Sequence, residues 1–200
     1  MTKSASESQR HGTEIRLTGG TLPPTRPVYH AVGPEYFVGR VLVEEQTVDY
    51  WELIEAANKQ VDIYNSAEEF FRGFATLPTY VQHLLATYWC QSEINNGGFD
   101  QFFFNSTGIL APEAEAGFRA MGLSEVADLL VEAIGRFGGR YPREREERQI
   151  AMDSLPSVGT RTFLYTGRRF ADLDDRFYSL LPGHAFFQHA EAYAALHRDC

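Results

Sequence analysis

Apolar residues recur every three or four positions through most of the chain from residue 48 onward. Trp51, Ile54 and Val61 follow this spacing, and acidic residues fall between them. One face of an α-helix has this period, so the pattern predicts amphipathic helices packed around a shared core. We therefore predict an all-α fold, a single compact domain of seven to nine helices.

Glycine, proline and small polar residues divide this pattern into separate helices. Asn65 or Ser66 precedes two acidic residues and suits a helix N-cap, and Pro78 fits the first turn of a long helix. The pairs Gly97–Gly98 and Gly138–Gly139 are expected to end helices, because glycine adopts left-handed backbone angles at little cost. The predicted helices cover about residues 48–64, 66–74, 78–95, 99–104, 112–121, 124–137, 142–153, 172–181 and 185–197.

The first 43 residues lack this period and are rich in Ser, Thr, Gly and Pro. They predict an irregular N-terminal arm over residues 1–43, with the helical domain over 44–200. Within the arm, residues 36–43 are enriched in β-branched and aromatic side chains, which favours one short strand. Pro156–Arg169 is predicted to be a second irregular segment, and it is basic.

Composition indicates a protein with a substantial core and no membrane association. Of the 200 residues, 44% are hydrophobic, and no apolar run approaches the roughly 18 residues that span a bilayer. The first residues lack the apolar segment of a secretory signal, so we expect a cytoplasmic protein. Cys90 falls in a predicted helix and Cys200 is the last residue of the sequence, so we expect no structural disulfide.

Negative charge is concentrated in the middle of the chain. The formal net charge is -9, and residues 44–135 contain fifteen acidic residues against three basic ones. Such a block repels phosphates, so we predict no direct nucleic-acid binding and a basic protein as the partner.

The carboxylates of this block repeat with helical spacing. Neighbours three or four residues apart on a helix face lie roughly 5 to 6 Å apart, a spacing of the same order as successive phosphates of nucleic acid. A solvated helix face gives the same pattern and is the default interpretation, with phosphate mimicry as the alternative. The candidate partner-binding residues are Asp49, Glu52, Glu55, Glu68, Glu69, Glu113, Glu115, Glu125, Asp128 and Glu132.

The run from Trp89 to Gly108 combines a helix end, a glycine pair and an aromatic cluster. Its glycines could cradle an anion, but no Lys or Arg lies within eight residues of Asn95–Gly98, so a corner between two helices is the better interpretation. The proposed structural signature consists of Trp89, Glu93, Asn95, Asn96, Gly97, Gly98, Phe99, Asp100, Gln101, Phe102, Phe103, Asn105, Ser106 and Gly108.

Glu93, Asp100 and Asn105 are the candidates for chemistry in this run. They could form an acid–base pair or supply oxygen ligands to a cation. The alternative, which we favour, is local capping: Asp100 caps the helix at 99–104, while Glu93 and Asn105 satisfy backbone groups at other helix ends.

Other motifs give no support for catalysis, a metal or a cofactor. Asp172–Asp175 lacks the glycine and further ligands of an EF-hand, so its acids are interpreted as charges at a helix N-terminus. His184, His189 and His197 are five and eight residues apart, which does not place them on one helix face for zinc. No Ser or Cys has the context of a catalytic nucleophile. We predict no catalytic residue, no metal ligand and no cofactor.

The run from Trp89 to Gly108 resembles the signature of a bacterial all-helical family that is named after a DNA-mimic protein and is otherwise of unknown function. The similarity continues through Gly117–Gly122, Ile134–Gly139, Arg145–Gln149 and Leu173–Tyr178, and it covers about residues 48–196. The resemblance implies a helical domain, with a homodimer as a candidate state, that presents carboxylates in a DNA-like array. It also implies that the array occupies the DNA-binding face of a transcription regulator or nucleoid protein, and it implies no catalytic residues.

Three functions follow as hypotheses. The first is a non-enzymatic, acidic protein-binding module that mimics DNA. The second is an immunity or antitoxin-like inhibitor of a basic nuclease or toxin. The third is an enzyme with a polar site at Glu93, Asp100 and Asn105, which would require a solvent-open pocket there.

Overall fold

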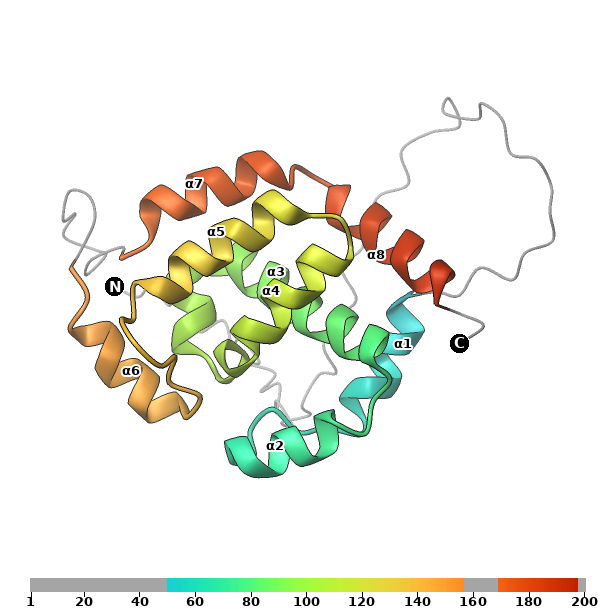
Figure 1. Ribbon diagram of the computed structural model, residues 1–200, viewed down its shortest axis with the longest axis horizontal. Coiled ribbons are helices and arrows are strands. Elements are labelled where there is room, and N and C mark those ends of the chain that lie inside the picture. The colour runs from blue at the N-terminus through green and yellow to red at the C-terminus, as the bar shows by residue number, and fades with distance from the viewer. Residues whose placement is uncertain (1–49, 157–168, 198–200) are drawn as a thin grey trace, which may run out of the picture. The chain divides into compact units, whose positions relative to one another are not determined.

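The computed structural model describes residues 50–156 and 169–197. These residues fold into eight α-helices and one 3₁₀ helix and contain no strand, which confirms the all-α prediction (Figure 1). The helices are α1 (Tyr50–Asn58), α2 (Ala67–Phe74), α3 (Thr79–Phe104), the 3₁₀ helix η1 (Ser106–Leu110), α4 (Ala111–Ala120), α5 (Ser124–Gly135), α6 (Arg145–Asp153), α7 (Ala171–Leu180) and α8 (Ala185–Leu196).

Some predictions concern residues outside the described ranges. They are the N-terminal arm 1–43 with its strand at 36–43, Asp49, most of the basic segment 156–169, and Cys200. For these, the sequence-based expectations stay predictions.

The long helix α3 lies in the middle of the described fold, and α1, α4, α6, α7 and α8 all pack against it (Figure 1). Its C-terminal end contributes Phe99 and Phe103, which are fully buried with ring centroids 5.9 Å apart. Phe177 of α7 meets Phe99 edge to face at 5.8 Å. Large aromatic side chains bury much apolar surface, so the end of α3 is held deep in the core.

The first helix ends at Asn58, six residues before its predicted end, because a local turn competes with it. The backbone N–H of Tyr64 donates to the side chain of Asp62 at 2.9 Å, and short polar side chains of this kind favour turns over helix. Ser66 then accepts a hydrogen bond from the backbone N–H of Glu69 at 3.3 Å, which confirms the predicted N-cap of α2.

Helix α6 begins at Arg145, three residues later than predicted. The hydroxyl of Tyr141 donates to the carbonyl oxygen of Gly108 at 2.7 Å, and the guanidinium of Arg143 donates to that of Ile109 at 2.6 Å. These long-range contacts fix the preceding segment against η1, so the helix starts only after them.

Candidate functional site

The glycine pair joins two helical segments within α3 through a sharp kink. Gly97 has φ -155° and ψ 22°, and Gly98 has φ 76° and ψ -176°, a backbone conformation open almost only to glycine. A Cβ added to Gly98 would lie 2.6 Å from the Oδ2 atom of Asp174. Glycine is therefore required here both by its backbone angles and by the close approach of α7.

Asp174 caps the segment that follows the kink. Its Oδ1 atom accepts a hydrogen bond from the backbone N–H of Phe99 at 2.8 Å, and its side chain is buried. Free N–H groups at a helix N-terminus bind anions, and here the anion is a carboxylate of the same chain. Asp174 lies in the first turn of α7, as the interpretation of Asp172–Asp175 as helix N-terminal charges expected, and it caps a second helical segment as well.

Asp100 does not cap its own helix, contrary to the prediction. Its carboxylate accepts from the backbone N–H of Arg169 at 2.8 Å and from the guanidinium of Arg169 at 2.9 Å. The same guanidinium reaches Asp153 at the end of α6, at 3.1 Å. Asp100 thus ties α3 to the residues before α7, which are 69 positions away in the sequence.

Glu93 binds side chains, whereas we predicted that it and Asn105 would satisfy backbone groups. Its carboxylate accepts from the side chains of Gln101 at 2.7 Å, Asn105 at 2.9 Å and Thr107 at 3.1 Å. These bonds join the segment before the kink to the segment after it and to η1. The polar groups of this corner are used in holding helices together.

Arg148, which was not among the predicted site residues, is a fully buried arginine beside the corner. Its guanidinium donates to the carbonyl oxygens of Phe103 at 2.6 Å, Asn105 at 2.7 Å and Arg143 at 2.9 Å. Two of these carbonyls belong to the C-terminal end of α3, where the helix dipole favours a cation. Burial lowers the pKa of Arg148. Its spacing of four from the buried Met152 was the signal that it faces inward.

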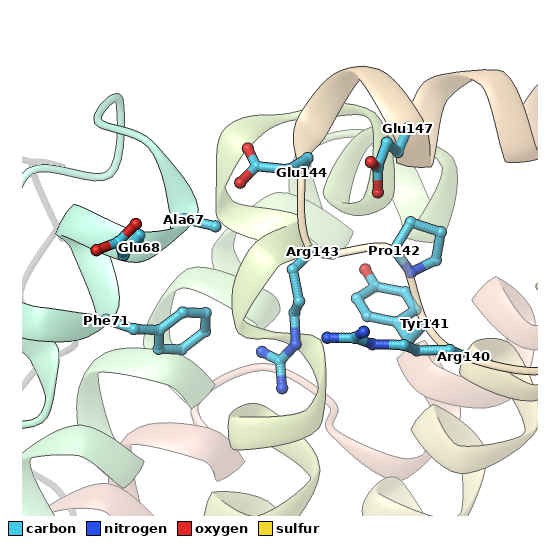
Figure 2. Close-up of a pocket in the computed structure, with 9 residues that line it drawn as sticks. All are labelled: Ala67, Glu68, Phe71, Arg140, Tyr141, Pro142, Arg143, Glu144 and Glu147. Carbon is cyan, nitrogen blue, oxygen red and sulfur yellow. The ribbon is translucent and has the colours of Figure 1, made fainter.

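Two pockets lie away from the corner. One, of about 600 Å³, lies between α2 and residues 140–147, and Figure 2 shows its lining side chains. The other, of about 630 Å³, lies beside residues 58–65 and Trp89. Neither is lined by Glu93, Asp100 or Asn105.

Half of the ten candidate partner-binding carboxylates form ion pairs with arginines. On the α4–α5 side, Arg119 bridges Glu115 at 2.7 Å and Asp128 at 2.9 Å. Such exposed pairs contribute little to stability, but a partner's cation would have to displace the arginine already there. The ion pairs are Glu68–Arg72, Glu113–Arg143, Glu115–Arg119, Asp128–Arg119, Glu132–Arg176 and Glu132–Arg136.

Four of the remaining candidates are exposed and have no ion pair with another described residue. They are Glu52 and Glu55 of α1, Glu69 of α2 and Glu125 of α5. Three carboxylates outside the predicted set are also exposed and without an ion pair at the start of α6, namely Glu144, Glu146 and Glu147. Helices α1, α2 and α6 lie along the lower side of Figure 1. We call the six residues Glu52, Glu55, Glu69, Glu144, Glu146 and Glu147 the acidic edge.

Within residues 50–156 and 169–197, no three His, Cys, Asp or Glu side chains are grouped so as to hold a metal ion. Of the helices described, none combines the length and apolar character needed to cross a bilayer.

Comparison with known proteins gives one family. The family model described as DMP19-like protein matches residues 75–197, from the end of α2 through α8. The kinked corner and Arg148 both fall within this match. Searches among curated proteins and solved structures give no match.

Proposed function

The chain belongs to the DMP19-like protein family, and from this membership we propose that it is a non-enzymatic DNA mimic. In this role it occupies the DNA-binding surface of a basic protein, and a transcription regulator or nucleoid protein is the partner class that we favour. The family supports a DNA-mimic role in general. The class of partner and the surface that binds it are our own proposals.

The observation that carries the proposal is the acidic edge. Its six carboxylates are exposed and have no arginine or lysine partner among the described residues. Three of them, Glu144, Glu146 and Glu147, lie within four consecutive residues at the start of one helix. Closely spaced negative charges on a rigid scaffold are the feature of a nucleic-acid backbone that a basic surface recognises.

The proposed mechanism is electrostatic competition. Lysines and arginines that would bind DNA phosphates bind the carboxylates instead, so the partner cannot hold DNA and this protein at once. Charge attraction speeds the encounter of the two proteins and weakens as salt screens it. The opposite side, with Glu115, Asp128 and Glu132, is less suited because its own arginines already neutralise these charges.

The test is capture of binding proteins by the full chain from its native lysate at low salt, followed by elution with duplex DNA. We expect a basic partner that duplex DNA releases. An edge variant, Glu52→Gln, Glu55→Gln and Glu69→Gln, should capture less of it. A control variant, Glu115→Gln, Asp128→Asn and Glu132→Gln, changes the net charge by the same amount on the arginine-paired side and should capture nearly as much as the wild type.

Two results would argue against the proposal. A partner that duplex DNA does not release would leave an acidic binding module without mimicry. Equal losses of capture in the edge and control variants would show that only net charge matters. A captured nuclease that loses its activity in the complex would instead favour the immunity-protein hypothesis.

A further inference from the structure

The pocket between α2 and residues 140–147 lies within the acidic edge and combines an apolar wall with charge. Phe71, Tyr141 and Pro142 supply apolar surface to this space of about 600 Å³ (Figure 2). Glu144 and Glu147, both members of the acidic edge, also line it. The pocket therefore offers a concave apolar surface beside unpaired carboxylates, which a flat acidic face does not.

The two ends of the pocket differ in charge. In Figure 2 the carboxylates of Glu144 and Glu147 lie on the α6 side, and the guanidinium groups of Arg140 and Arg143 lie on the opposite side. Arg143 forms an ion pair with Glu113, which offsets its charge. The carboxylate end is therefore the part of the pocket that attracts a cation.

Both carboxylates belong to the start of α6. Glu144 is the N-cap of α6 and Glu147 is three residues further on, so they occupy the same first turn. Negative charge at a helix N-terminus is favoured by the helix dipole.

We propose that this pocket receives a lysine side chain from the basic partner, an inference that rests on the proposed function. The aliphatic part of lysine would lie against Phe71 and Pro142, and its ammonium group would bind Glu144 and Glu147. Lysine is a flexible apolar stem that ends in a point charge, which suits a pocket of this composition.

Lysine fits this pocket better than arginine. An arginine gains most from stacking its planar guanidinium on an aromatic ring. The guanidinium of Arg143 already lies over the ring of Phe71, with its central carbon 4.9 Å from the ring centroid. An incoming arginine would lose that stacking partner and would bring a second guanidinium close to the first.

The test uses the full isotope-labelled chain and a short probe, the capped peptide Gly-Lys-Gly, followed by two-dimensional NMR. The matched controls are Gly-norleucine-Gly, which keeps the stem without the charge, and Gly-Arg-Gly. We expect the lysine peptide to shift the amide signals of Phe71 and of residues 140–147. The arginine peptide should bind more weakly, and the norleucine peptide should give no saturable shift.

Variants locate the site. Glu144→Gln with Glu147→Gln should weaken binding of the lysine peptide by about fivefold, as expected for two partly exposed charge contacts. Glu146→Gln alters the same helix outside the pocket lining and should have little effect. Arg140→Gln removes the opposing charge and should strengthen binding. Retention of the wild-type amide spectrum outside the pocket checks that each variant is folded.

Three outcomes would overturn the pocket inference: shifts dispersed over other acidic surfaces, equal shifts with norleucine, or an equal loss in Glu146→Gln. If the lysine peptide does not bind the pocket but a partner is still captured and released by duplex DNA, this inference alone is rejected. A lysine site without any DNA-released partner would reject the proposed function and keep the pocket.

Discussion

At the scale of single residues, the corner depends on charged groups placed inside the protein. Arg148 is fully buried, and the partners found for its guanidinium are carbonyl oxygens, two of them at the end of α3. Asp174 is equally buried and caps the segment after the kink. Buried charges of this kind cost much when one partner is removed, because the other is left unsatisfied.

Replacement of Arg148 by Met should destabilise the fold by about 2 to 4 kcal/mol, since several buried carbonyl groups lose their donor. Urea unfolding followed by circular dichroism measures this change. Arg145→Met is the matched control, because Arg145 is exposed. Among the described residues, the one backbone acceptor of its side chain is the carbonyl oxygen of Phe104. Equal, small effects in the two variants would show that Arg148 does not hold the corner.

Gly98→Ala should destabilise the protein by more than about 2 kcal/mol, because it adds backbone strain and a contact with Asp174. Gly139→Ala separates the two effects. Gly139 also has positive φ, at 71°, but a Cβ there meets nothing within 4 Å, so only the strain of about 1 kcal/mol should appear. Unfolding midpoints that move equally in both variants would contradict the close packing at Gly98.

At the scale of elements, local signals predicted the helices better than the contacts between them. Ser66 caps α2 as expected, and the glycine pair interrupts α3 as expected, because both effects depend on neighbouring residues. Asp100 and Phe99 find their partners 69 and 75 residues away, and no local pattern indicates such pairs. The acidic candidates show both cases. Arg72 and Arg119 lie one helical turn after Glu68 and Glu115, which is a local signal, whereas Arg143 pairs with Glu113 from 30 residues away.

The contact between α3 and α8 contains titratable rings. His83 of α3 shares a hydrogen bond of 2.7 Å with the hydroxyl of Tyr193 on α8, and the ring of His197 lies against Tyr193 and Tyr80. Burial and, to a smaller extent, the charge of His197 lower the pKa of His83. Protonation of His83 is therefore less favourable in the folded protein than in the unfolded chain.

Stability should fall as the pH drops below the ordinary histidine pKa of about 6.5, since the unfolded chain then binds more protons at His83. Above that pH this contribution is constant. Urea unfolding at pH 7.5 and at pH 5.5 measures the effect, and His83→Gln should reduce the difference while His184→Gln, an exposed control, should not. A pH dependence that is the same in all three proteins would exclude His83 as its source.

At the scale of the whole molecule, the distribution of charge matters more than its total. The net charge of -9 is modest, yet the six carboxylates of the acidic edge on α1, α2 and the start of α6 have no ion pair among the described residues, whereas arginines neutralise Glu115, Asp128 and Glu132 of α4 and α5. A partner would therefore meet two acidic surfaces of different availability. The mimic proposal predicts that it uses the acidic edge.

The salt dependence of partner binding should report this preference. Affinity should fall as salt rises, and the fall should be shallower for the edge variant, which has three fewer carboxylates without an ion pair, than for the wild type. The control variant should keep nearly the wild-type slope. Binding that is flat between low and high salt would count against an electrostatic mechanism.

The most direct test of mimicry is competition between this protein and DNA for one surface. The DNA-released partner is bound to a fluorescently labelled duplex, and the full chain is added while the anisotropy of the duplex is followed. We predict that the anisotropy falls to the value of free DNA as the partner transfers to the acidic edge. The edge variant should need a higher concentration than the wild type to release the same amount of duplex. A rise in anisotropy, from a complex in which the partner holds DNA and this protein together, would contradict the proposal.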